Sequence, residues 1–263
     1  MRSSSPWTSQ VEDGTWQLWS CIRQTKCGGK TRLFYHWEGK TLTDANWAPK
    51  GIAMRADPDV GETNGGLQAP HVIRRNGTFL MFYGDWQHIT LATSNDGKNF
   101  NRQLNRAGTV GLFDEGPGNN TRDPMVLPIG DVLYCYYTAF LGGKGAVYCR
   151  LSWTNLGDWS ASKMVAFGGR AGTNPFSAEC PHVVLLDGYY YLFRTQRYGR
   201  DALTSVYRSQ NPLDFGVEDD RCFVGTLPVA APEIIQHEGK WFIAALNPNL
   251  DGIRITRLRW IHD

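Results

Sequence analysis

The sequence contains no apolar run long enough to cross a membrane, which argues against an integral membrane protein. Its first residues, Met1-Arg2-Ser3-Ser4-Ser5-Pro6, also lack the apolar core of a signal peptide. Because such a peptide can be removed during export, a periplasmic or secreted location stays open. We therefore expect no membrane partner and leave the compartment unassigned.

The sequence also has little excess charge of either sign. Its 27 Lys and Arg residues and 25 Asp and Glu residues give a formal net charge of +2, and they are dispersed along the chain. Binding to nucleic acid or to an anionic lipid surface needs a cluster of basic residues. We therefore expect neither partner, and the composition does not address the oligomeric state.

Cysteine is sparse, with six residues and no Cys-x-x-Cys spacing of the kind that binds metals. Cys135 and Cys149 lie on either side of a predicted hairpin loop, as do Cys21 and Cys27, so each pair could lie on neighbouring strands. Reduced side chains in strands or core are the preferred interpretation, and disulfides are the alternative. The sequence therefore indicates no metal and no cofactor.

What the chain does have is a repeated pattern: a proline, then about seven residues later a turn glycine followed by an aromatic strand. Ala69-Pro70-His71-Val72 leads to Asn76-Gly77-Thr78-Phe79, and the later copies have the same arrangement. The marker prolines are Pro6, Pro70, Pro124, Pro181 and Pro232. Self-similarity at such a spacing indicates repeated supersecondary units.

Each repeat has turn residues at the spacing expected of four short antiparallel strands. In the second repeat these are residues 71–74, 79–83, 89–93 and 110–113, separated by turns that contain Asn, Asp and Gly. Five such units predict an all-β, five-bladed β-propeller that occupies residues 1–263 as a single domain. The fifth blade is short, so its outer strand must come from the N-terminus or be absent.

The strand directions of this fold predict which loops lie at which end of the propeller. The hairpin turns predicted for one end are tight, whereas residues 54–68, 114–122, 168–178 and 195–203 form long loops at the other. Long loops on a rigid scaffold are where binding and catalytic sites concentrate. We therefore expect the functional pocket at that end.

Residues that flank the marker prolines begin the innermost strands and should converge on the central axis. They are Gln68, His71, Arg122, Asp123, Glu179, His182 and Glu233. Asp123 and Glu179 then approach one pocket from neighbouring blades. Burial and a nearby carboxylate both raise the pKa of a Glu, as a general acid requires, and a pair of carboxylates is the usual equipment for glycoside hydrolysis.

Two of these segments resemble motifs of a known enzyme superfamily. Arg122-Asp123-Pro124 resembles the Arg-Asp-Pro motif of the five-bladed furanosidases of glycoside hydrolase families 32, 68 and 43, and Glu179-Cys180 resembles their Glu-Cys motif. Gly66-Leu67-Gln68 falls where family 32 has a substrate-contacting segment. The resemblance implies that Glu179 is the general acid and that Asp123 holds sugar hydroxyls and stabilises the transition state.

The chain departs from that pattern in the first repeat. Those families place an Asp, their nucleophile or general base, directly before the first-blade proline, where this chain has Ser5. A serine cannot act as a carboxylate, so a base must come from elsewhere. The candidates are Asp57, Asp59 and Glu62 in a long crossover loop, ranked above Glu233 at the start of the fifth blade; solvated loop charges are the alternative for the first three.

The predicted rim of the pocket is rich in arginine and aromatic residues. They are Arg23, Trp86, Arg194, Arg197 and Tyr198. Arginines there could bind a carboxylate, sulfate or phosphate, and the aromatic rings could stack on sugars. Surface arginine without a ligand is the alternative, and for His71 and His182 the alternative is a structural histidine.

The sequence thus predicts a glycoside hydrolase-like enzyme that acts on a small glycoside or oligosaccharide, such as a furanoside, with a carbohydrate as its ligand. One alternative is a carbohydrate-binding propeller that has lost hydrolysis together with the first-blade Asp. The other is a glycosidase for anhydro or acidic sugars, or a phosphorylase, that uses the pocket arginines. The sugar, its linkage and the stereochemical outcome stay open.

Overall fold

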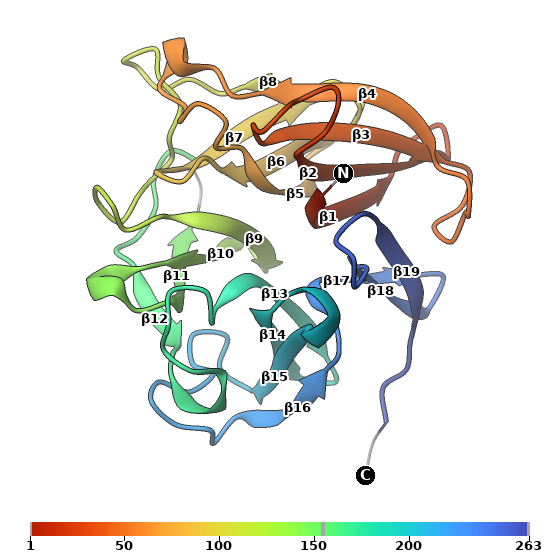
Figure 1. Cartoon of the computed structure of the whole chain (residues 1–263). Helices are drawn as coiled ribbons and strands as arrows, with labels where there is room; N and C mark the ends of the chain where they lie inside the picture. Colours follow the sequence, from red (N-terminus) through yellow and green to blue (C-terminus); the bar gives the residue numbers. More distant parts are fainter. Residues whose placement is uncertain (1, 154–155, 262–263) are drawn as a thin grey trace.

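The structure, a computed structural model, describes residues 2–153 and 156–261, with the backbone alone for residues 2–7. Within these residues the strands form five antiparallel sheets arranged around a central axis, and no α-helix is present (Figure 1). The predicted all-β, five-bladed propeller is therefore confirmed. None of the short helices in this part of the chain has the length and apolar character of a membrane span.

Each blade is a meander that runs outward from the axis. The innermost strands are β1 (Arg2–Gln10), β5 (Gln68–Arg75), β9 (Arg122–Ile129), β13 (Glu179–Leu186) and β17 (Ala230–His237). The second strands are β2 (Trp16–Arg23), β6 (Thr78–Gly84), β10 (Val132–Ala139), β14 (Tyr189–Arg197) and β18 (Lys240–Leu246). All five innermost strands contain a marker proline, as the sequence predicts.

The outer half of each blade is more variable. The third strands are β3 (Leu33–Gly39), β7 (Ile89–Ser94), β11 (Ala146–Ser152), β15 (Leu203–Ser209) and β19 (Ile253–Leu258). The fourth strands are β4 (Ala48–Arg55), β8 (Asn101–Arg102), β12 (Lys163–Ala166) and β16 (Phe223–Leu227). Short 3-10 helices occupy the loops: η1 (Pro58–Val60), η2 (Leu141–Gly143), η3 (Gly169–Ala171) and η4 (Gly199–Asp201).

Tight hairpins join the first and second strands of three blades. At Asn76-Gly77, Asp187-Gly188 and Glu238-Gly239 both turn residues have positive φ, from 48° to 82°. Two such residues in succession define the type I′ turn, whose twist matches that of the flanking strands. These turns fix the register of the hairpins, for example Arg75 opposite Thr78.

The outer strand of the second blade differs from the sequence prediction. The strand that pairs with β7 is β8, Asn101–Arg102, and not residues 110–113. Residues 112 and 113 return to the sheet only through hydrogen bonds to Ile89. The outer edge of β7 is therefore covered by two separate pieces, with residues 104–111 looping out between them, which an alternating apolar pattern does not reveal.

The fifth blade has three strands in the described residues, in the order β17-β18-β19. The N-terminal strand β1 pairs with β2 in the first blade, so it does not supply the missing outer strand. The last and first blades instead meet through side chains. The carboxylate of Glu233 on β17 accepts hydrogen bonds from the backbone N–H of Thr8 at 3.1 Å and from its hydroxyl at 3.4 Å.

The residue before each described marker proline has an unusual backbone conformation. Ala69, Asp123, Cys180 and Ala231 have φ values of 44°, 54°, 47° and 49°, in the left-handed region that non-glycine residues seldom occupy. Each lies at a shift in strand register, and β1 has its shift between Ser4 and Pro6. Such bulges bend a strand and redirect a side chain, here at the central axis.

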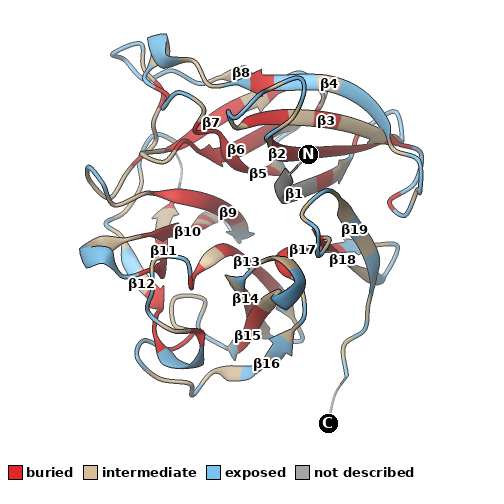
Figure 2. Ribbon diagram, viewed as in Figure 1, coloured by how far each residue is buried: buried red, intermediate tan, exposed pale blue. Residues whose placement is uncertain are grey.

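Apolar side chains fill the spaces between neighbouring blades rather than one central core, and the inner strands are the most buried (Figure 2). Phe82 on β6 and Tyr137 on β10, for instance, belong to the cluster between the second and third blades. Equivalent clusters join the other neighbouring blades. Each blade thus covers apolar side chains of its neighbours, and the closed ring of blades surrounds the central axis.

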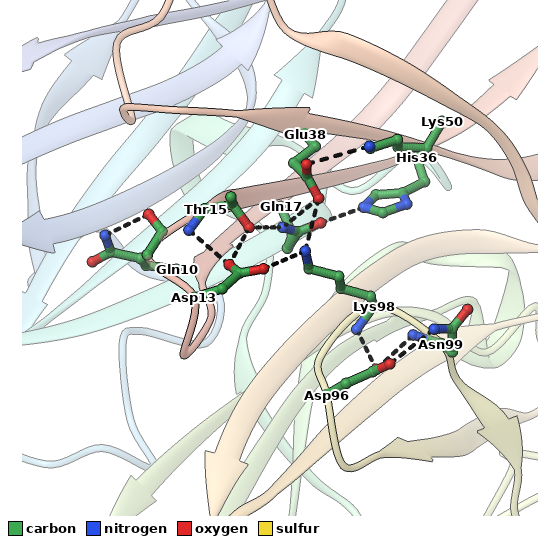
Figure 3. A network of polar contacts seen from close by, with 11 residues as sticks. Gln10, Asp13, Thr15, Gln17, His36, Glu38, Lys50, Asp96, Lys98 and Asn99 are labelled. Carbon is green, nitrogen blue, oxygen red and sulfur yellow. Dashed lines mark hydrogen bonds and ion pairs between the residues drawn. The ribbon is translucent and has the colours of Figure 1, made fainter.

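A polar network supports the junction of the first and second blades (Figure 3). Lys98, in the turn after β7, donates to Asp13 at 2.6 Å and to Glu38 on β3 at 2.9 Å. Gln17 donates to the Glu38 carboxylate at 3.3 Å and is hydrogen-bonded to His36 at 2.6 Å. One ammonium group therefore links a turn and a strand of the first blade to the second blade.

All six cysteines are described, and no disulfide joins any of them. Cys135 lies opposite Arg150, and Cys149 lies opposite Tyr136. Because neighbouring positions of a strand point to opposite faces, these two thiols are not a cross-strand pair.

We predict that Glu233→Gln makes the protein more stable at neutral and alkaline pH. Burial raises the pKa of the Glu233 carboxyl well above its usual range, so the folded state retains a proton that the unfolded chain loses. Stability should then fall by about 1.4 kcal/mol per pH unit between the two pKa values, and the amide avoids this loss while still accepting from Thr8. Thermal unfolding of both proteins from pH 5 to 9 measures the difference.

The exposed Glu238→Gln is the matched control, because removing a solvated carboxylate should leave the pH dependence of unfolding unchanged. A gap between Glu233→Gln and the parent protein that stays constant or narrows as pH rises would contradict the assignment.

Candidate active site

A cavity of about 230 Å³ opens at the end of the axis where the innermost strands begin. Side chains from all five blades or their loops line it: Arg23, Arg32, Gln68, Trp86, Asp123, Phe176, Glu179, Cys180, Tyr198, Leu246 and Leu250. Several of these residues are those that the sequence places around a pocket. The long loops before β5, β9 and β13 lead into it, as their predicted position at this end requires.

Asp123 and Glu179 reach the cavity from the first residues of two adjacent inner strands, β9 and β13. Asp123 lies in the left-handed bulge of β9, and Glu179 is the first residue of β13, one position before the equivalent bulge. Both side chains are largely buried, with exposed fractions of 6% for Asp123 and 16% for Glu179. The bulges therefore bring two carboxylates from neighbouring blades to one side of the cavity.

Arg122 holds these two carboxylates together. Its Nε lies 3.5 Å from Oδ2 of Asp123 and 3.3 Å from Oε1 of Glu179, and its Nη2 lies 2.8 Å from the same Glu179 oxygen. Because both oxygens are this close to one nitrogen, the carboxylates are well inside the separation of about 10 Å that bounds working pairs. The guanidinium is fully buried and stacks over Phe140 at 4.2 Å.

Burial raises the pKa of Glu179, and the negative charge of Asp123 raises it further, whereas the Arg122 guanidinium opposes both effects. The net direction is upward. A carboxyl group with a raised pKa retains its proton nearer to neutral pH and can donate it.

Asp123 acts as a hydrogen-bond acceptor. Its Oδ2 accepts from the backbone N–H of Cys180 at 3.1 Å and lies 3.6 Å from the Cys180 thiol. That thiol in turn lies 3.3 Å from the hydroxyl of Tyr198. The two carboxylates thus have different partners, which is how paired acids come to serve different roles.

Gln68 and Trp86 form the part of the wall contributed by the second blade, as predicted. Gln68 is buried, and its Nε2 has no hydrogen-bond acceptor among the described residues. Trp86 has a left-handed backbone, with φ of 77°, and its ring stacks against the guanidinium of Arg32 at 4.8 Å. Arg23, at the end of β2, lines the same cavity.

Two predicted rim arginines lie elsewhere. Arg194 is fully buried and donates to the carbonyl oxygens of Ser177, Gly172 and Gly168 at 2.8 to 3.3 Å. It holds the loop before β13 in place, so the prediction that it binds a ligand is corrected. Arg197 is exposed and is not part of the cavity wall, because it points out from the end of β14.

The acidic residues of the loop that was predicted to supply a base, residues 57–62, also lie outside the cavity. The Glu62 carboxylate is completely buried, accepting from Tyr83 at 2.7 Å and pairing with Arg102 at 2.8 Å. Asp57 caps the 3-10 helix η1 by accepting from the backbone of Asp59. None of these three acids lines the cavity, so the structure does not bring the predicted base candidates to Asp123 and Glu179; Asp57 and Glu62 instead make hydrogen bonds within their loop.

His71, His182 and Glu233 lie below the cavity, along a narrow central channel of about 30 Å³. The His71 ring bonds to the carbonyl of Val126 at 3.1 Å, and His182 accepts from the backbone of Ile234 at 3.2 Å. Burial lowers the pKa of His71 to about 4 and that of His182 to about 3, so both are neutral at pH 7. The channel position of these three residues corrects their assignment to the cavity.

Sequence reasoning missed Arg32, Phe176, Cys180, Leu246 and Leu250 as parts of the wall. Arg32 comes from the loop between β2 and β3, far in sequence from any marker proline. Its backbone N–H donates to the carbonyl of Gly65 at 3.3 Å, which ties that loop to the segment before Gln68. The Gly-rich composition of residues 24–32 was the one available sign of a loop at the pocket end.

A larger cavity, of about 620 Å³, lies between the outer strands of the first two blades. It contains none of the predicted site residues, and its acidic wall residue, Glu38, is occupied by Lys98 and Lys50. Paired acids, a raised pKa and an unpartnered donor all favour the axial cavity as the functional site. In the described part of the chain, no cluster of three or more His, Cys, Asp or Glu residues could hold a metal ion.

No protein-family model and no curated protein sequence matches the chain. Solved structures do resemble it. A thermostable family-43 glycoside hydrolase is 18% identical with a TM-score of 0.75, covering 98% of this chain and 90% of its own. The endo-arabinase from Bacteroides thetaiotaomicron is 13% identical with a TM-score of 0.76, covering 100% and 96%.

A family-32 β-fructofuranosidase from Bombyx mori is 17% identical with a TM-score of 0.63, covering 93% of this chain and 56% of its own. At these identities the likeness is one of fold. The chain therefore has the five-bladed fold of the superfamily that its Arg-Asp-Pro and Glu-Cys segments resemble.

We predict that Arg122→Met destabilises the protein by about 3–5 kcal/mol near neutral pH, as expected when one partner of a buried ion pair is removed. Asp123 and Glu179 would then be buried side by side without a counter-charge. The loss should shrink in acid, where the carboxyl groups take up protons. Urea unfolding at pH 8 and pH 5 measures both effects.

Arg106→Met, at an exposed loop position, is the control and should change stability little. A loss below about 1 kcal/mol for Arg122→Met would show that the bridge contributes no more than a surface pair does.

Proposed function

We propose that this protein is a glycoside hydrolase-like enzyme that cleaves a small glycoside or oligosaccharide, such as a furanoside, in the axial cavity. The observation that supports it most is the arrangement of Asp123 and Glu179 around the buried Arg122, with one carboxylate accepting a backbone N–H and the other carrying a raised pKa. Structural neighbours that share the fold include a β-xylosidase/α-arabinofuranosidase in complex with xylotriose and a family-43 enzyme in complex with xylose.

Glu179 is the proposed general acid. Its protonated carboxyl would donate to the glycosidic oxygen as the bond to the anomeric carbon breaks, which removes the need to expel an alkoxide. Asp123 is the proposed stabiliser of the transition state, since an ionised carboxylate beside the ring favours the positive charge that develops there. Arg122 fixes the distance between the two groups.

The remaining wall is suited to holding a sugar in place. The unpartnered Nε2 of Gln68 can donate to a hydroxyl, and the faces of Trp86 and Phe176 offer apolar surface for a ring. The small volume of the cavity favours one or two sugar units over a long chain.

The proposal leaves the base unassigned. Asp123 and Glu179 are the acidic residues that line the cavity in the described part of the chain. The first-blade position that holds an Asp in the furanosidases holds Ser5 here. This substitution favours a second candidate, a carbohydrate-binding propeller that does not hydrolyse its ligand.

We predict that Glu179→Gln lowers turnover by about 100-fold or more on any glycoside that the enzyme cleaves, because the amide cannot donate a proton to the leaving group. A panel of chromogenic glycosides and oligosaccharides identifies the substrate first. Binding of that substrate to the variant, measured by calorimetry, should persist because the amide retains the shape of the side chain.

Asp59→Asn is the matched control, since Asp59 is an exposed acid outside the cavity and its loss should leave turnover unchanged. An unchanged rate in Glu179→Gln would refute its role as the acid. Binding of oligosaccharides without cleavage of any of them would favour the binding-protein candidate.

A further inference from the structure

The two sides of the axial cavity carry opposite chemical character. Asp123 and Glu179 come from the third and fourth blades and present carboxyl oxygens. Arg23, Arg32 and Gln68 come from the first and second blades and present N–H donors; we call these three residues the donor wall. In Figure 1 the inner strands of the first and fourth blades, β1 and β13, lie on opposite sides of the axis, and residues of both groups line the same cavity.

Arg32 is the central residue of the donor wall. Its guanidinium stacks on Trp86 at 4.8 Å, and its nearest polar side-chain contact is the Cys21 sulfur, 3.9 Å from Nη1. In the described residues no carboxylate lies within ion-pairing distance of it. Stacking uses the face of a guanidinium and leaves the N–H groups on its edge for a planar or tetrahedral oxyanion.

Stacking and backbone contacts also hold Arg32 in position before any ligand binds. Its backbone N–H donates to Gly65, and the segment around it forms a bridge with Gly66 in the loop that leads to Gln68. A cation held in advance loses less conformational freedom when it binds, so the wall is organised for recognition. This arrangement differs from that of Arg194, whose nitrogens all serve loop carbonyls.

Gln68 supplies an independent observation that points to a ligand. It is 4% exposed, and its Nε2 is buried without an acceptor in the described residues. Leaving a buried donor unsatisfied is costly, and native proteins seldom do so without a functional reason. The missing partner must be an oxygen acceptor that enters the cavity.

The two acids of the cavity have partners other than Arg32. Glu179 is paired with the buried Arg122 at 2.8 Å, and Asp123 accepts from the backbone of Cys180. The blade that contributes both arginines of the donor wall is also the blade in which Ser5 stands where an Asp is found in the furanosidases. The first blade therefore contributes two guanidinium groups, those of Arg23 and Arg32, to the cavity wall.

We propose that the donor wall binds an anionic oxygen group that accompanies the sugar: the carboxylate of an acidic sugar or a free phosphate. The inference rests on the proposed function for the sugar itself, and it names the class of substrate or co-substrate that the site takes. Arg32 and Arg23 bind the oxyanion, and Gln68 donates to an adjacent oxygen. Neutral sugars then bind more weakly than their acidic counterparts.

Calorimetric titration of the full chain with D-glucuronate, D-glucose and inorganic phosphate tests this inference. Glucuronate should bind at least about 10-fold more tightly than glucose if the oxyanion is carried by the sugar, and phosphate should bind measurably if it is free. Arg32→Gln should weaken binding of the preferred anion by at least about 10-fold and so reduce the advantage of that anion over glucose, and high salt should weaken anion binding more than glucose binding. Arg106→Gln is the matched control and should bind all three ligands as the parent does.

The inference is overturned if glucuronate binds no better than glucose and phosphate does not bind, or if Arg32→Gln binds the anion as the parent does. Thermal unfolding of Arg32→Gln, a half-buried position, shows whether the variant is folded, and Arg23→Gln repeats the test at the second cation.

Glu179→Gln separates this inference from the proposed function. It should lower turnover by about 100-fold or more and retain anion binding, so a failure of catalysis leaves the anion result independent. Turnover of neutral glycosides by the parent protein without any preference for an anion would refute this inference and leave the hydrolase proposal standing.

Discussion

The left-handed residue before the proline of the inner strands β5, β9, β13 and β17 is the constraint on which the rest of this structure depends. Holding a non-glycine residue at φ of 44° to 54° costs of order 1–3 kcal/mol, and four described positions do so. The surrounding blades must stabilise this conformation, and in return every inner strand turns its first residues toward the axis. Without that bulge Asp123 would follow the pleat of β9, and no two carboxylates would meet.

The bulges also place residues of the site at contacts between blades, and these contacts stabilise the ring. Arg122 precedes the bulge of the third blade, and Glu179 precedes that of the fourth, so their 2.8 Å ion pair is also a contact between blades. At the junction of the last and first blades, Glu233 bonds to Thr8. Buried polar pairs thus join neighbouring inner strands at two junctions of the ring, and the pair between β9 and β13 also lines the cavity.

Features whose sequence signals lie within a few residues were predictable, whereas features that depend on contacts distant in the sequence were not. The proline repeat and the Asn-Gly and Asp-Gly turns act within a few residues, so the propeller, its inner strands and the meeting of Asp123 with Glu179 were predictable. Glu62 and Arg194 bond to side chains and carbonyls 17 to 40 residues away, and these contacts depend on how loops fold back, so both residues were wrongly placed at the pocket. Arg32 was missed because its position depends on a loop-to-loop bridge with Gly66 that leaves no pattern in the sequence.

The opposite character of the two cavity walls has a consequence for the proposed acid. Glu179 owes its raised pKa to burial and to Asp123, while Arg122 acts against both. An anion held by Arg32 and Arg23 would add negative charge to the cavity, and a nearby negative charge disfavours ionisation of a carboxyl group. Ligand binding and protonation of Glu179 would then favour each other by linkage, since each must strengthen the other equally. A cavity lined by Arg23 and Arg32 would thus gain, on binding its anion, an electrostatic environment that keeps the proposed general acid protonated.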